Sequence, residues 1–77
     1  MADIEVFKVG SVVWGKYLEK GNAQGLLNGH ERELLDIAIK YSNGIYTSLR
    51  AKQAIEILSI KSKLVEAGVL SKRRNNE

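Results

Sequence analysis

One long segment, from Thr47 or Ser48 to Ala67, constrains the fold of this chain more than any other feature. Its interior contains neither Gly nor Pro and is rich in Ala, Leu, Lys, Glu and Gln, which favour helices. Gly68 follows the segment and suits the left-handed position of a Schellman motif, in which Val69 packs back on the last turn. The sequence therefore predicts a long C-terminal helix that ends at Ala67.

This helix carries an apolar surface roughly twice as wide as the arc of about 100° that a surface helix needs. The first apolar stripe comprises Leu49, Ile57, Ile60, Leu64 and Ala67, and the second comprises Ala51, Ala54, Leu58 and Val65. One stripe can cover the core while the other contacts a second chain, or both can pack against neighbours within one fold. We predict that the second stripe is an interface, with packing inside the fold as the alternative.

A shorter helix is predicted just before the long one. Asn28, followed three places later by Glu31, matches the spacing of a capping box, with Asn in place of the usual Ser or Thr. Asn43-Gly44 ends this helix, and Ile45 is placed to fold back on it. Because only three or four residues would then join the two helices, we predict an antiparallel αα-hairpin.

The opening stretch "KVGSVVWGKYLEKG", residues 8–21, favours a third helix over residues 12–20. Ser11 is its expected N-cap, and Gly21 its expected C-terminal stop. Trp14 lies on the apolar face of this helix, where we expect it to anchor the helix to the αα-hairpin. Residues 3–9 are then extended or a short strand, and "GNAQGLLNG" forms a loop or one short turn. The predicted fold class is mainly all-α, a small arrangement of three helices.

The alternative is an α+β fold with an N-terminal β-hairpin. "IEVFKV" and "VVWGKYL" are rich in residues that favour strands, and Gly10-Ser11 is an acceptable two-residue turn between them. The segment "VGSVVWGK", residues 9–16, also resembles the first barrel strand of PWWP domains. The chain has no Pro for the Pro-Trp-Trp-Pro element, and the rest of the sequence favours helices, so nothing further is taken from this resemblance.

Composition excludes most kinds of reactive site. The chain has 77 residues and no Cys, which removes disulfides and thiolate metal sites, and its only histidine is His30. "HEREL" lacks the second histidine of a zinc-binding HExxH motif, because Leu34 stands at that position. His30 is better explained as a residue of a first helical turn. We therefore expect no catalytic residue, no cofactor and no metal.

Charge is unevenly distributed along the chain. Residues 1–36 carry four basic and six acidic side chains, a net −2, whereas residues 37–77 carry eight basic and three acidic ones, a net +5. We expect one helical domain over 1–70, a flexible basic tail over 71–77 and a cytoplasmic protein without a signal peptide or membrane helix. The candidate contacts to a polyanion are Arg50, Lys61, Lys63, Lys72, Arg73 and Arg74.

These features predict a small non-enzymatic protein–protein interaction module. A chain of this size buries only about 60% of its unfolded surface, so self-association would help to stabilise it. We expect a homodimer or homo-oligomer that acts as an adaptor, an inhibitor or a regulatory partner of a larger protein. The alternative function is a nucleic-acid-binding regulator that uses the basic C-terminal half.

Overall fold

Four α-helices build the computed structural model, which describes residues 2–70. The helices are α1 (Ala2–Val9), α2 (Ser11–Ala23), α3 (Gly29–Ser42) and α4 (Ala51–Glu66). No strand occurs within residues 2–70. The all-α prediction is therefore confirmed, the β-hairpin alternative is wrong, and the predicted three helices are in fact four.

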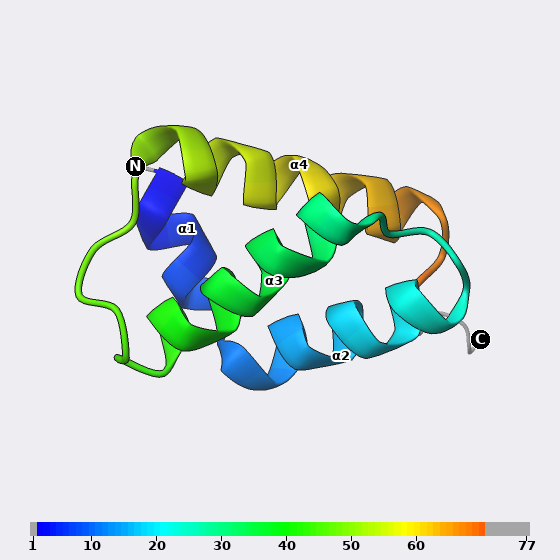
Figure 1. Cartoon of the computed structure of the whole chain (residues 1–77), viewed down its shortest axis with the longest axis horizontal. Coiled ribbons are helices and arrows are strands. Elements are labelled where there is room, and N and C mark those ends of the chain that lie inside the picture. Colours follow the sequence, from blue (N-terminus) through cyan, green and yellow to red (C-terminus); the bar gives the residue numbers. More distant parts are fainter. Residues whose placement is uncertain (1, 71–77) are drawn as a thin grey trace.

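The helices form a compact bundle (Figure 1). In this view α2 lies along the lower edge and α4 along the upper edge, while α3 runs between them in the opposite direction to both. The short α1 stands steeply between the start of α4 and the start of α2. It packs mainly on α4 and α3, and α2 packs mainly on α3. The radius of gyration is 12.1 Å, close to the roughly 11–12 Å expected for a folded domain of this length.

The core lies where all four helices meet. Its largest fully buried side chains are Trp14, Leu35, Ile57, Leu64 and Val6. Among residues 2–70 no polar or charged residue is classed as buried. The core is thus apolar throughout, and each helix contributes to it.

The first helix, α1, corrects the prediction that residues 3–9 are extended or a strand. "IEVFKV" alternates apolar and polar residues as a strand does, but only Val6 is fully buried, with Ala2 and Val9 half-buried beside it. Acidic residues lie in the first turn and Lys8 in the last, where each complements the helix dipole. A helix of eight residues is unstable alone, so packing on α3 and α4 is what stabilises it.

Trp14 joins α1 to α2. Its indole Nε1 donates a buried hydrogen bond of 2.8 Å to the carbonyl oxygen of Val6, one of the last four carbonyls of α1. Gly10 makes the sharp bend between the two helices, with a φ of 90° that favours glycine. Trp14 is fully buried in the core, and its hydrogen bond ties it to α1, a helix that was not predicted, where the sequence had suggested an anchor to the αα-hairpin.

Helix α2 begins and ends at different residues from those predicted. Gly10, not Ser11, is its N-cap, and the helix continues through Gly21 to Ala23. The helical conformation ends at Gly25, whose φ is 72°. Gly21 has another role: a Cβ at this position would lie 3.1 Å from both Leu27 Cδ1 and Leu64 Cδ2. The absence of a side chain there lets α2 approach the core closely.

The ends of α2, α3 and α4 share one motif. Gly25, Gly44 and Gly68 each have a positive φ and each donate to a carbonyl three residues back. The next residue donates to a carbonyl five residues back, as in Val69 N–H to Leu64 O at 2.9 Å. These are the hydrogen bonds of the Schellman motif. The motif is confirmed at Gly68 and Gly44, although the Ile45 side chain remains 63% exposed instead of covering α3.

The αα-hairpin of α3 and α4 is antiparallel, as predicted, but its connection is longer. Residues 43–50 join the helices, because α4 begins only at Ala51 and not near Thr47 or Ser48. Leu49 packs on the core from this connection instead of from the helix. Helix α1 packs against both α3 and α4 (Figure 1), and the longer connection passes beside it.

Candidate interaction surface

The outer side of α4 carries a line of mainly apolar residues that we call the α4 ridge. It consists of Ala51, Ile55, Leu58, Ser62 and Val65. The steps of four, three, four and three residues keep these positions on one line along a helix. Ile55 is 61% exposed and Val65 is 50% exposed, while Leu58 is half-buried. Apart from Ser62 the ridge is therefore apolar, and four of its five residues are exposed to solvent.

The predicted interface residues do not all lie on this ridge. Ala51, Leu58 and Val65 do, whereas Ala54 is completely buried between α4 and its neighbours. Ala54 belongs to the buried core cluster, and α1 is the main packing partner of α4. Ile55 takes its place on the exposed line. The i, i+4, i+7 spacing of Ala51, Ile55 and Leu58 was the sequence signal that could have identified it.

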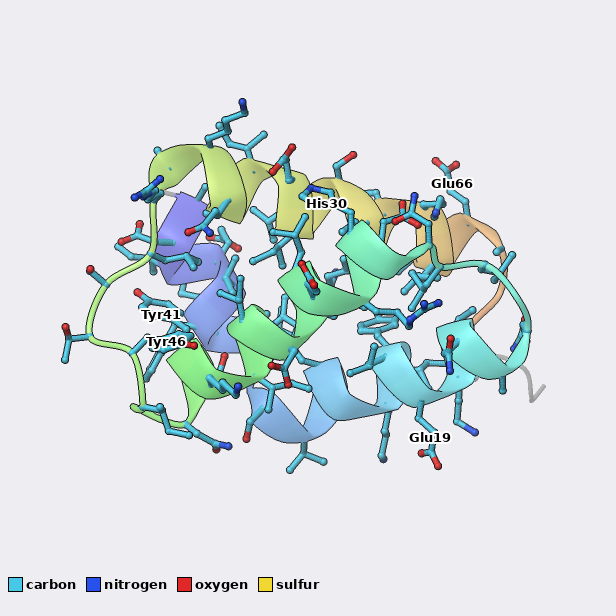
Figure 2. All side chains as sticks on the ribbon, in the orientation of Figure 1. Glu19, His30, Tyr41, Tyr46 and Glu66 are labelled. Atoms are coloured by element: carbon cyan, nitrogen blue, oxygen red, sulfur yellow. The ribbon has the colours of Figure 1, made fainter. Side chains whose placement is uncertain are left out.

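One edge of the ridge is polar and regularly spaced. Lys52, Ser59 and Glu66 are all exposed and stand seven residues apart, so they share one side of α4. Figure 2 shows Glu66 pointing away from the bundle. On the opposite edge lie buried Ala54 and half-buried Lys61. The ridge thus has one charged outer edge and one edge that turns into the fold.

Lys63 lies on the side of α4 that faces α3, where it is fully engaged. Its Nζ donates to the carbonyl oxygen of Leu26 at 2.8 Å and to Glu31 Oε2 at 2.7 Å. The other carboxylate oxygen of Glu31 accepts from the Asn28 backbone N–H at 2.9 Å, completing a capping box. These hydrogen bonds from Lys63 and Asn28 lower the pKa of Glu31. Lys63 therefore fastens α4 to the start of α3.

Arg32 stabilises the same turn from its other side. Its Nη1 donates to the carbonyl oxygen of Leu27 at 3.0 Å and to Asn22 Oδ1 at 3.2 Å. Leu27 is itself buried in the core and anchors this loop. Two basic side chains thus satisfy two successive loop carbonyls, Leu26 and Leu27.

The six residues predicted to contact a polyanion are only partly described. Lys72, Arg73 and Arg74 lie outside residues 2–70. Lys63 is engaged with Leu26 and Glu31, and Arg50 and Lys61 stand eleven positions apart, about 16 Å along a helix. The described residues therefore bring no cluster of these basic groups together, and binding to nucleic acid stays a prediction.

His30 lies exposed in the first turn of α3, as predicted. It lines an open depression between α3 and α4 together with Glu56 and Ser59, among others; Figure 2 shows where His30 lies. Within residues 2–70 no hydrogen bond links these three side chains, and no group of three or more His, Cys, Asp or Glu residues is placed to hold a metal ion. None of the helices in this part of the chain is long and apolar enough to cross a membrane.

A second apolar patch lies at the end of the bundle where α3 meets α1. The rings of Phe7 and Tyr41 meet edge to face with centroids 5.9 Å apart. Phe7 is 54% exposed, and Ile45 and Tyr46 are also exposed. Figure 2 shows Tyr41 and Tyr46 at this end, away from the middle of α4. This end patch draws its residues from α1, α3 and the connection after α3, and it lacks the regular helical spacing of the α4 ridge.

Comparison with models of known protein families, with curated proteins and with solved structures finds no match.

Proposed function

We propose that this chain is a small non-enzymatic protein–protein interaction module that self-associates through the α4 ridge. In this role it acts as an adaptor, an inhibitor or a regulatory partner of a larger protein. The observation that carries the proposal is the exposure of Ile55 and Val65 on one line of a helix whose other side is fully used by the core.

Burial energetics support this choice of surface. Each Å² of apolar surface removed from water contributes about 25 cal/mol, so exposed Ile and Val side chains gain by being covered. Single exposed apolar residues are common on monomers, but a contiguous line of them is typical of interaction sites. The ridge continues over the whole length of α4, about 24 Å for its 16 residues. It offers a second helix a continuous contact.

Sedimentation equilibrium over a range of micromolar concentrations tests the proposal. We expect the wild-type chain to show a concentration-dependent dimer and Ile55→Glu to sediment as a folded monomer, because a charge would be buried in the interface. Val12→Glu is the matched control. Val12 is 71% exposed but lies on α2, so this variant should dimerise as the wild type does. A wild-type chain that stays monomeric throughout would refute self-association.

A further inference from the structure

We infer that the second copy docks on the α4 ridge antiparallel to the first, with Ser59 of both copies close to the two-fold axis. This inference rests on the proposed self-association and specifies its geometry. It follows from the charged edge of the ridge, from the symmetry of its apolar residues and from the dipole of α4.

The charged edge is self-complementary in one orientation. Lys52 and Glu66 each lie seven residues from Ser59, on opposite sides of it. In an antiparallel pair with two-fold symmetry the same edge of each helix meets its copy. Lys52 then faces Glu66 of the second copy, and Glu66 faces Lys52 of the second copy. Two identical ion pairs, each between Lys52 and Glu66 of different copies, then flank the two serines at the axis.

Two apolar residues of the ridge are arranged about Leu58, one residue from the centre of the charged edge at Ser59. Ala51 and Val65 each lie seven residues from Leu58, so antiparallel docking places the small side chain of Ala51 opposite the larger Val65 of the second copy. Leu58, next to Ser59, meets its own copy at the axis. Large against small is the arrangement that fills space between packed helices.

A parallel pair lacks these advantages. Its two-fold axis runs along the helices, so the Lys52 edge of one copy would meet the edge that carries Lys61 and buried Ala54 in the other. The dipoles of the two α4 helices would also point the same way, which is unfavourable, whereas antiparallel dipoles attract. One ridge is smaller than the roughly 800 Å² per partner of a standard stable interface, so we expect a weak and reversible dimer.

Cysteine crosslinking tests the orientation, because the chain has no Cys of its own. Ser59→Cys, treated with a short bismaleimide, should give a covalent dimer. Lys52→Cys alone should not, because residues 52 of the two copies would lie about 21 Å apart along the helices. Mixing Lys52→Cys with Glu66→Cys should restore crosslinking between the two different chains. All three sites are exposed in the monomer, so each variant should fold.

Charge reversal provides an independent readout by sedimentation at low salt. Lys52→Glu and Glu66→Lys should each weaken dimerisation by roughly threefold to tenfold, since each change places like charges together in two places. The double variant should return to near the wild-type dissociation constant, because both pairs are then reversed. In a parallel dimer, Lys52→Glu would have little effect and the double variant would behave like Glu66→Lys.

The outcomes separate the two levels of inference. A monomeric wild type overturns the proposed function and the orientation with it. A dimer that Ile55→Glu dissociates, but that Ser59→Cys does not crosslink, overturns the antiparallel geometry and leaves the self-associating ridge standing. Crosslinking of Ser59→Cys together with rescue by the double charge reversal supports both.

Discussion

At the scale of single residues, this fold depends on side-chain donors that reach free backbone carbonyls. A helix leaves its last four carbonyls without partners in the helix. The indole of Trp14 satisfies one at the end of α1, while Lys63 and Arg32 satisfy two in the turn after α2. Each of these donors links its own helix to a different part of the chain. Removing one of these donors should therefore lower the free energy of unfolding more than removing an ordinary surface side chain does.

Trp14→Phe removes the indole donor and leaves the Val6 carbonyl buried and without a partner. We expect a loss of about 2–4 kcal/mol in the free energy of unfolding, from the unsatisfied carbonyl and the smaller ring together. Urea unfolding followed by circular dichroism measures this. Tyr17→Phe, which keeps a buried ring in the same helix, is the control and should change stability by less than about 1 kcal/mol. Equal losses in the two variants would argue against the hydrogen bond.

Glu31 should make stability depend on acid pH. Because its pKa is lowered in the folded state, its contribution is fully present above the ordinary glutamate pKa of about 4.3 and is lost as the pH falls through the lower folded value. Glu31→Gln keeps an acceptor for the Asn28 N–H but loses the charge. We expect urea midpoints of this variant to fall less between pH 5 and about pH 2.5 than those of the wild type. Glu33→Gln, an exposed change on the same helix, should retain the wild-type slope.

At the scale of the elements, glycine determines where helices stop and where they approach each other. Three glycines end helices in the left-handed conformation, at Gly25, Gly44 and Gly68. Gly21 looks the same in the sequence but lies inside α2, against Leu27 and Leu64. Spacing alone does not distinguish these two uses, which is why α2 was predicted to end too early.

Two glycines of α2 give a matched test. Gly15→Ala should raise stability by about 0.5–1 kcal/mol, because no atom lies within 4 Å of the new Cβ and alanine favours helix. Gly21→Ala has the same gain in propensity but crowds two core leucines, so we expect a net loss of about 1–2 kcal/mol. Thermal unfolding of both variants measures the difference. If Gly21→Ala raised stability as much as Gly15→Ala does, Leu27 and Leu64 would have to move aside with no loss of stability.

At the scale of the whole molecule, the core of the bundle is apolar, and the exposed large apolar side chains lie on the α4 ridge, at the end patch and, singly, at Ile4 and Val12. A dimer formed through the ridge stabilises the folded state by mass action. We therefore expect the melting temperature of the wild type to rise with protein concentration, and that of Ile55→Glu to stay constant. Differential scanning calorimetry at several concentrations measures both. A wild-type melting temperature independent of concentration would contradict this expectation.

Much of the bundle follows from local sequence. The capping box of Asn28 and Glu31, the long helix up to Glu66 and the stops at Gly44 and Gly68 depend on groups within a few residues of one another. Such local interactions are visible in the sequence because the groups that make them are close in it. For the same reason the candidate ridge was found in outline, from the periodicity of α4.

The remainder depended on contacts between distant residues. The α1 helix packs on α3 and α4 and buries Val6. Gly21 lies inside α2, where a side chain would crowd Leu27 and Leu64. Ala54 is completely buried. The sequence by itself favoured an all-α chain and located the helix stops at Gly44 and Gly68. Only the tertiary structure decided which apolar face of α4 stays exposed, because that depends on where the other three helices pack.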